Sequence, residues 1–317
     1  MRRGTELHPR IIYDTAELPA AIHQTLAPYL AAQTTHRLIM IPAQHYRELQ
    51  EGPWWRALLL ELRITPVRTL AFQDDRILIV EGAGGEYEPD LAVIVIPAAN
   101  LVAIQLATVL LYSYVELWWA VADRIETIRI EFNSVGADVI ERELRRLRSA
   151  EQPQREMMPL TELAPVDPVA AHEHKQKREA LPLKFRNFIR TSLLPGETIH
   201  AIIYEPAIRQ PGVRLNPFLS PNRAIVLTDQ NLIMIKDARP GKKGHSLSNV
   251  YRYDRFFVPR RYLHNVKVSI QSDITYVDFL LGTSRAQQTE SIPLLPPRVA
   301  ELRRALADWP VEDALRV

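Results

Sequence analysis

Two stretches of the chain share one pattern of apolar and polar positions. Residues 68–81 and 223–236 each hold two apolar runs around a short polar centre, and they align from Arg68 and Arg223 onward. The runs are rich in Ile, Val and Leu, which favour strands, while the Asp and Asn residues of the centres favour turns. Each stretch therefore predicts a β-hairpin, and their likeness indicates that one domain is written twice.

A helix and a strand are expected before each hairpin. Apolar residues four apart predict a helix over residues 18–30, and the β-branched run at 35–41 predicts a strand. The same order returns as a helix over 181–194, ended by Pro195-Gly196, and a strand over 198–204. The repeat therefore extends upstream of the hairpins.

Four more strands and a closing helix are expected after each hairpin. Segments 92–101 and 254–263 both end a strand at an aliphatic residue followed by Pro, which cannot donate a ladder hydrogen bond. The next strands are expected at 102–110, 115–121 and 126–132 in the first copy, and at 264–270, 275–281 and 287–292 in the second. Apolar stripes predict the closing helices, at Val139, Ile140, Leu144 and Leu147 and at Val299, Leu302 and Leu306.

The copies differ between their first and second strands. Residues 44–65 predict a helical insertion packed by aromatic side chains, whereas residues 208–222 predict an irregular, proline-rich loop. Residues 149–179 hold several prolines and mixed charge, so they read as a linker. We therefore expect a first domain at 1–148 and a second at 180–317.

Seven antiparallel strands and one closing helix per copy predict a mainly β, α+β fold with a barrel or sandwich in each half. The order resembles the bacterial pleckstrin-homology-like (PH-like) domains. The residues that carry this resemblance are Leu-Leu-Pro-Gly-Glu at 193–197 and Leu-Thr-Asp-Gln-Asn-Leu at 227–232. It covers 181–309 well and 18–148 less well, where Gln73 replaces Thr. The resemblance implies two tandem seven-stranded barrels, each with a lead-in helix and a C-terminal capping helix, and an interaction or assembly role.

Composition places the chain among soluble globular proteins. It has 317 residues, of which 47% are hydrophobic and 24% charged, and it lacks Cys, which excludes disulfides and thiolate chemistry. Residues 91–115 carry no charge, a length that can span a bilayer. Pro97, Asn100 and Gln105 interrupt that run, and its β-branched residues favour two buried strands. Without an apolar N-terminal segment, a cytoplasmic location is expected.

Motifs that suggest chemistry are better explained by structure. The glycine-rich stretch 82–87 lacks the third glycine of a dinucleotide fingerprint, so it reads as a surface loop. His172 and His174 lack a third metal ligand at helical spacing and read as part of the linker. His200 and His264 fall in predicted strands and read as wall residues. No catalytic residue, metal site or cofactor is expected.

Two adjacent tryptophans fall in one predicted strand. Neighbouring side chains of a strand point to opposite faces, so one of Trp118 and Trp119 is expected in the core and the other outside. The outer one is a candidate contact residue, because tryptophan is enriched at interfaces.

Charged residues are unevenly distributed along the chain. Residues 178–309 hold 20 basic and 11 acidic residues, a net of +9, while residues 1–148 have a net of −4. A basic patch attracts anionic lipid or nucleic acid; the alternatives are a solvated surface, or one that docks the acidic first copy through Glu86, Glu88 and Asp90. The candidate residues of an anionic surface or partner site are Arg239, Lys242, Lys243, Arg252, Arg255, Arg260 and Arg261.

Three functions compete at this point. The first is a non-enzymatic interaction or assembly module with a protein partner or self-association. The second is a peripheral binder of anionic membrane at the inner face of the membrane, although the first hairpin loop, 208–222, offers only Arg209 and Arg214 for the headgroup contacts that the family uses. The third is an enzyme, which no arrangement of nucleophile and base supports. Nucleic acid is not expected as a partner.

Overall fold

The computed structural model describes residues 8–30, 37–49, 60–82, 91–108, 112–150, 176–209, 218–237, 253–271, 274–307 and Trp309. Contacts divide the chain into two units. Unit 1 holds residues 1–99, 111–114 and 130–151, and unit 2 holds residues 100–110, 115–129 and 152–317. Each unit is described by itself. The protein is mainly β with a few helices, as the strand patterns predict.

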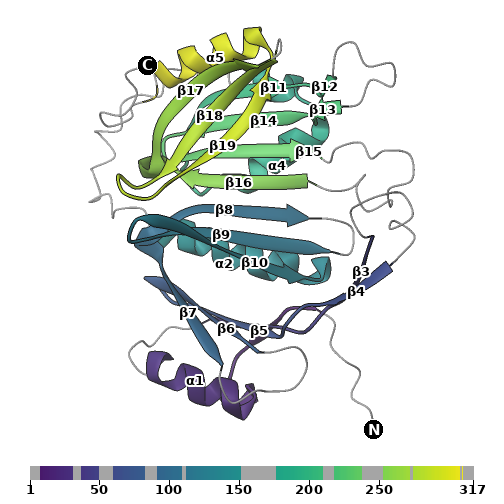
Figure 1. Cartoon of the computed structure of the whole chain (residues 1–317), viewed down its shortest axis with the longest axis vertical. Coiled ribbons are helices and arrows are strands. Elements are labelled where there is room, and N and C mark those ends of the chain that lie inside the picture. Colours follow the sequence, from purple (N-terminus) through teal and green to yellow (C-terminus); the bar gives the residue numbers. More distant parts are fainter. Residues whose placement is uncertain are drawn as a thin grey trace. The chain divides into compact units, whose positions relative to one another are not determined.

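Unit 1 is built on one antiparallel sheet of five strands in the order β1-β2-β5-β6-β7 (Figure 1). Its strands are β1 (Arg10–Ile12), β2 (Arg37–Ile41), β5 (Arg68–Phe72), β6 (Arg76–Glu81) and β7 (Ala92–Pro97). The predicted hairpin of residues 68–81 is confirmed, with Phe72 opposite Ile77 at its turn. Four β6 residues in a row are buried because the sheet is covered on both faces.

Helices cover this sheet. Helix α1 (Ala20–Leu30) buries Ile22 and Leu26 with Leu78 and Val80 of β6 in one apolar cluster. Helix α2 (Ala137–Ala150) buries its predicted stripe, including Leu144 and Leu147. Short 3-10 turns complete the unit: η1 (Thr15–Glu17), η3 (Ala98–Asn100) and η4 (Ser134–Gly136).

Unit 2 contains a three-stranded sheet, β17-β18-β19, and most of a seven-stranded sheet in the order β10-β9-β8-β16-β15-β14-β11, in which residues 113–114 and 130–132 belong to unit 1. The larger sheet comprises β8 (Leu101–Thr108), β9 (Ser113–Val121), β10 (Arg124–Phe132), β11 (Ile199–Glu205), β14 (Arg223–Thr228), β15 (Asn231–Asp237) and β16 (Tyr253–Pro259). The smaller comprises β17 (Leu263–Gln271), β18 (Ile274–Gly282) and β19 (Gln287–Leu294). Helices α4 (Leu183–Ser192) and α5 (Pro296–Ala307) complete the unit, and the turn η6 (Arg260–Tyr262) joins β16 to β17.

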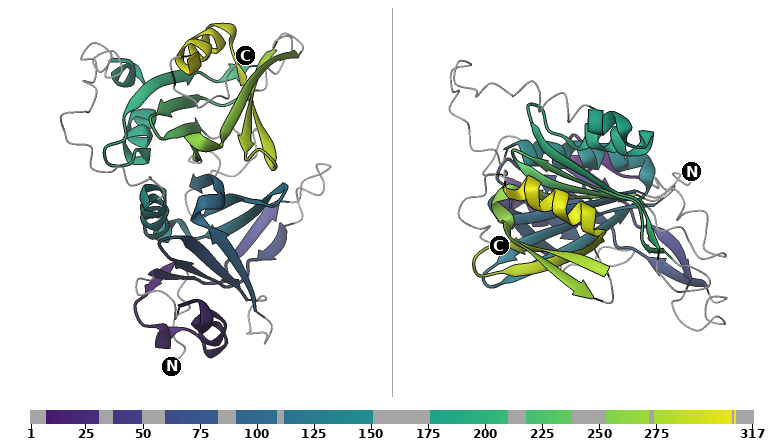
Figure 2. Two further views of the ribbon diagram at one scale, coloured as in Figure 1. Left: turned by 90° about the vertical axis from the view of Figure 1, so that its left-hand side faces the viewer. Right: turned by 90° about the horizontal axis from the view of Figure 1, so that it is seen from above.

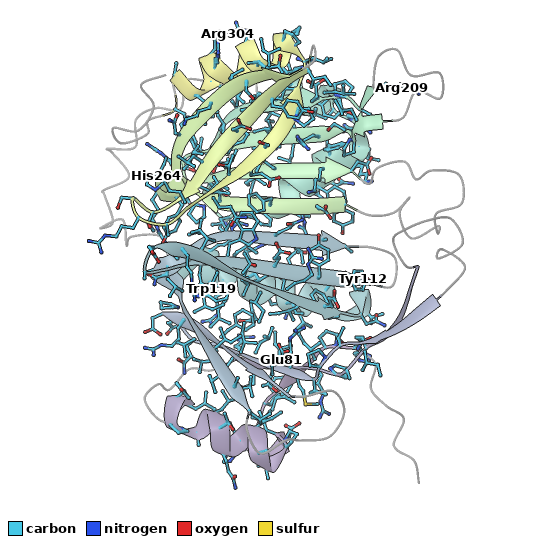
Figure 3. All side chains as sticks on the ribbon, in the orientation of Figure 1. Glu81, Tyr112, Trp119, Arg209, His264 and Arg304 are labelled. Atoms are coloured by element: carbon cyan, nitrogen blue, oxygen red, sulfur yellow. The ribbon has the colours of Figure 1, made fainter. Side chains whose placement is uncertain are left out.

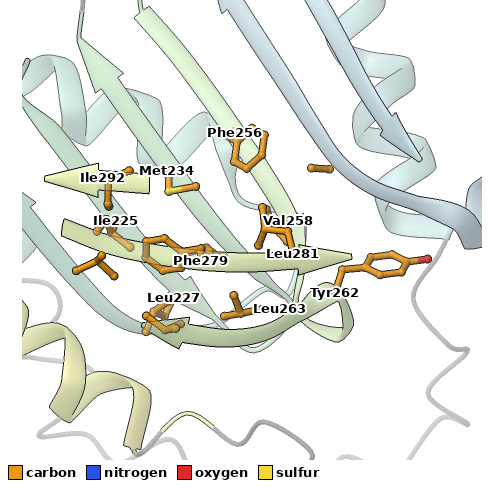
Figure 4. Packing of buried hydrophobic residues seen from close by; sticks show 14 of the residues in the cluster. Ile225, Leu227, Met234, Phe256, Val258, Tyr262, Leu263, Phe279, Leu281 and Ile292 are labelled. Atoms are coloured by element: carbon orange, nitrogen blue, oxygen red, sulfur yellow. The ribbon is translucent and has the colours of Figure 1, made fainter. Parts of the chain in front are cut away.

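The core of unit 2 lies between its two sheets. Met234 and Phe256 from the large sheet belong to one buried cluster with Phe279 and Ile292 from the small one (Figure 4). Helix α5 lies across the strands (Figure 2) and adds Leu302 to that cluster. The predicted burial of Leu302, and of Leu306 one turn further on, is confirmed.

The sheets are open and do not form the two seven-stranded barrels that the resemblance implies. Strand β16 ends at Pro259, and η6 then leads the chain into β17, which belongs to a different sheet. The second side of β16 pairs with β8, in a register that places Arg255 opposite Leu106. Contacts therefore group β8 with residues 152–317 rather than with the expected first domain, 1–148.

The insertion predicted to be helical begins and ends in strands. Strand β3 (His45–Leu49) pairs with β4 (Leu60–Ile64) as a two-stranded sheet, and residues 50–59 lie outside the described residues. The irregular loop 208–222 likewise holds two short paired strands, β12 (Ile208–Arg209) and β13 (Phe218–Ser220). Both insertions pair their own ends, which satisfies backbone groups locally.

Helix α4 ends at Ser192, two residues before the predicted end at 194. Gly196, directly after Pro195, has a φ of 78°, in the left-handed region that favours glycine, and lies in a turn closed by the Glu197 N–H donating to the Leu194 carbonyl oxygen. Only the end of the predicted linker, residues 176–179, is described, and it is helical.

Candidate functional site

The predicted basic surface is placed only in part. Arg239, Lys242, Lys243 and Arg252 lie outside the described residues, and so do Glu86, Glu88 and Asp90 of the docking alternative. Arg255 is 2% exposed in the middle of β16, with its guanidinium carbon 5.8 Å from the centre of the Tyr253 ring. It is a buried sheet residue and cannot contribute to an open surface.

Arg260 and Arg261 lie on η6. The Arg260 guanidinium is 5.7 Å from the Trp309 ring, and that of Arg261 is 4.9 Å from the Tyr262 ring. Stacking on aromatic faces stabilises a cation by about 0.5–1 kcal/mol at exposed sites. Of the three described candidates, Arg261 alone is exposed. The structure therefore does not bring the described candidates together on one open face.

The Leu-Thr-Asp-Gln-Asn-Leu motif at 227–232 holds the β14–β15 turn together. The Thr228 side-chain oxygen accepts the backbone N–H of Asn231 at 2.8 Å and donates its own proton to Glu197. Glu197 also accepts the side-chain N–H of Asn231 at 2.7 Å and the backbone N–H of Leu194 at 2.6 Å. Thr228 is fully buried. The polar residues of the motif are therefore explained by the hydrogen bonds that hold the turn.

Trp309 closes this network from the far end of the chain. Its indole Nε1–H donates to the backbone carbonyl oxygen of Thr228 at 2.6 Å, and the side chain is 2% exposed. The sequence pattern did not point to this residue, because it follows the apolar stripe of α5. An isolated tryptophan just after a capping helix was the available signal.

A small cavity lies between the two sheets of unit 2, whose side chains are drawn in Figure 3. Its volume is about 20 Å³, which suits one water molecule rather than an organic ligand. Its lining includes Arg223, Lys236, Asp254 and Glu290, and Lys236 lies 3.4 Å from Asp254. Lys236 and Asp254 thus form an ion pair at the rim of the cavity.

Glu205 is the described acid whose surroundings most oppose its charge. It is 1% exposed, and burial raises the pKa of its carboxyl above the ordinary value of 4.5, while the Leu295 N–H bond at 2.7 Å and the charges of Arg298 and Arg223 act in the opposite direction. It sits at the end of β11 opposite Arg223. This arrangement links fold stability to pH.

The other candidate site residues are structural, or they lie outside the described residues. Residues 83–87 and both linker histidines are not described, and no metal-binding group of three ligands occurs among the residues that are. His264 lies in β17 with Nε2 2.7 Å from the Gly282 carbonyl oxygen. The expected division of the tryptophans is wrong: Trp118 and Trp119 are 6% and 7% exposed, because β9 is covered on both faces.

The outer edge of β7 is the candidate binding site that remains. Among the described strands, β7 pairs only with β6, and Val93, Ile94 and Val95 are half-buried. The sequence analysis expected a buried strand here. An apolar edge strand without charges is a template for pairing with another chain.

Hydrogen-bond alternation shows which β7 groups are available. The Ala98 N–H donates to the Asp75 carbonyl oxygen at 2.7 Å, just beyond the strand pair. Antiparallel ladders bond at every second residue, so Ile94 bonds to β6, whereas Val93 and Val95 direct their N–H and C=O groups outward. The outward row continues to Pro97, whose missing N–H suits an edge.

Comparison of the chain with protein-family models, with curated proteins and with solved structures gave no match. No helix in the described part of the chain is long and apolar enough to cross a membrane. The edge of β7 therefore has to be interpreted from its own chemistry.

Proposed function

We propose that this chain is a non-enzymatic interaction module made of two PH-like domains in tandem. The order of elements supports the two domains. A lead-in helix, four antiparallel strands, a 3-10 turn, three antiparallel strands and a closing helix run from α1 to α2 and again from α4 to α5, apart from the short pairs β3–β4 and β12–β13. The repeated sequence pattern of the hairpins supports the same conclusion.

The outer edge of β7 carries the interaction role. Extended peptides that add to a sheet edge gain main-chain hydrogen bonds, and the alternating side chains give selectivity. β7 offers outward backbone groups at Val93 and Val95 beside half-exposed apolar side chains. A strand from a protein partner is the ligand that this surface fits best.

Binding to anionic membrane is the alternative. It requires a cluster of basic side chains that reaches the lipid surface. The burial of Arg255 weakens it, and Arg261 is the described candidate that favours it.

Hydrogen exchange with a strand peptide tests the proposal. The probe is a peptide with the β8 sequence, Leu101–Thr108, flanked by lysines for solubility, since β8 already pairs with the comparable strand β16. We expect slower exchange at the amides of Val93 and Val95. The control peptide carries Pro in place of Ile104 and Leu106, and should give no protection.

Co-sedimentation with vesicles separates the alternative. The interaction module should stay in the supernatant with both neutral and anionic vesicles. Salt-sensitive binding to anionic vesicles together with an unprotected β7 would replace the proposal with the membrane function.

A further inference from the structure

Strand β17 has an unpaired outer edge like that of β7. Among the described strands it pairs only with β18, and it forms one side of its sheet (Figure 1). Ile270, near its end, is 76% exposed, which is unusual for a large aliphatic side chain, while Val268 is half-buried. In the part of the chain that the structure describes, β7 and β17 thus both carry apolar side chains along an outer edge.

The pairing of β8 with β16 shows how such edges fit one another. Asp254, Arg255 and Phe257 of β16 lie opposite Ala107, Leu106 and Ile104 of β8. The Arg260 N–H bonds to the Gln230 carbonyl oxygen, so alternation directs the backbone groups of Arg255 and Phe257 toward β8. With β8 on its flank, β16 buries Phe256 and Phe257 to 7% and 6% exposure.

In the element order, β7 takes the place of β16, and β17 takes the place of β8. Counting from the prolines that end the strands, Pro97 and Pro259, Val93 falls on Arg255 and Val95 on Phe257. These are the residues whose backbone groups face outward on β7 and face β8 on β16. The outward backbone groups of β7 thus lie at the positions that, on β16, pair with β8.

We propose that β17 of one molecule pairs antiparallel with β7 of a second molecule, in the register that β8 adopts on β16. This inference rests on the proposed equivalence of the two halves. The register places Val268 opposite Val93 and Val266 opposite Val95. It also places Lys267 opposite Ile94.

This contact joins different surfaces of the two molecules. Because every molecule carries one β7 edge and one β17 edge, association is head to tail, and it produces rings or open chains rather than only pairs. Pairing removes the half-exposed Val93, Ile94 and Val95 from water and satisfies the outward backbone groups of both strands. The ligand of the β7 edge is therefore a second copy of this chain.

Sedimentation velocity of the full chain over a range of concentrations tests the inference. The unmodified protein should form dimers and larger species as its concentration rises. Ile94→Lys places a second cation opposite Lys267, and like charges directly opposite destabilise a strand pair, so association should weaken about tenfold or more. Val135→Lys adds the same charge at an exposed position on η4 and should leave association unchanged.

A charge reversal identifies the partner strand and its register. Lys267 is exposed, and in the double variant Ile94→Lys with Lys267→Glu the two positions carry opposite charges. The double variant should associate again. Its association would also show that the Ile94→Lys substitution does not unfold the protein. Circular dichroism of each variant provides a second check of folding.

Three results would overturn the inference. They are a protein that stays monomeric at every concentration, oligomers that Ile94→Lys leaves intact, and a folded Ile94→Lys variant that Lys267→Glu fails to restore. If β7 is nevertheless protected by the β8 peptide, the interaction function stands and only self-association is wrong. If the peptide also gives no protection, both fail.

Discussion

The two hairpin turns of this protein occupy the same place in their units but are held by different chemistry. In unit 2, Thr228 is fully buried and Trp309 donates to its carbonyl oxygen. In unit 1, Gln73 stands at the Thr position and donates its side-chain N–H to the Tyr29 carbonyl oxygen at 3.1 Å. Arg146 then reaches the turn from α2.

The unit 1 turn is held partly through water-exposed charge. Arg146 lies 2.9 Å from Asp74, whose side chain is 69% exposed, and it also donates to the Phe72 carbonyl oxygen at 3.4 Å. Exposed ion pairs contribute about 0–1 kcal/mol, whereas a buried aromatic side chain contributes several. The two equivalent turns are thus stabilised by interactions of very different free energy.

The largest expected effect is the loss of Trp309. Trp309→Ala should lower the free energy of unfolding of unit 2 by about 3–5 kcal/mol, because it opens a cavity and leaves the Thr228 carbonyl oxygen without this donor. Asp74→Ala, which removes only the exposed ion pair at the matching place in unit 1, should cost about 1 kcal/mol or less. Urea unfolding, followed by hydrogen exchange of β14 and of β5, measures the two effects. Equal losses would contradict the difference between the turns.

A smaller effect is expected at the turn residues themselves. Thr228→Val should cost about 2–3 kcal/mol, since it leaves the buried Asn231 N–H without its acceptor and removes the hydrogen bond from Thr228 to Glu197. Gln73→Leu in unit 1 removes one hydrogen bond and should cost about 1 kcal/mol. The same exchange experiment compares them. A tolerated Thr228→Val would show that the hydroxyl network is incidental.

The smallest effect is a dependence of stability on pH. Arg68 lies 2.9 Å from the half-exposed Glu81 on β6, whereas Arg223 has Lys236 at that position and faces Glu205 on β11 instead. Because burial raises the pKa of Glu205, the folded state binds more protons than the unfolded state above pH 4.5, so this residue lowers stability as pH rises through its folded-state pKa.

Glu205→Gln should remove that part of the fall in stability. Urea unfolding at a series of pH values from the ordinary carboxyl pKa to neutrality gives the slope for both proteins. Glu81→Gln, at the related ion pair of unit 1, is the matched control. An unchanged slope in Glu205→Gln would show that Arg223 and Arg298 compensate the buried charge fully.

Much of the fold could be predicted from local sequence pattern. The hairpins, the strands after them and the apolar stripes of the closing helices follow from side-chain periodicity, which burial enforces on any element. The prediction of a helical insertion at 44–65 was wrong because its aromatic and leucine residues fit either a helix or strands. The prediction that one of Trp118 and Trp119 lies outside the core was wrong because alternation assigns side chains to the two faces of a strand but does not show what covers each face.

The candidate site was less predictable. The basic residues were found by counting charge, and a count does not distinguish a surface side chain from Arg255, which β16 buries between its neighbours. The edge of β7 was read as a buried strand because its apolar, β-branched sequence is the same for a central strand and for an edge strand.

The sequence by itself determined most of the strands and helices, where turns and Pro stops fall, and which face of each closing helix enters a core, because these depend on local conformation and on apolar periodicity. Only the tertiary structure decided that β8 pairs with β16, that the sheets stay open, and that β7 and β17 each have one neighbour among the described strands. Strand neighbours are chosen through backbone groups that every residue carries, so the choice leaves little trace in side-chain identity.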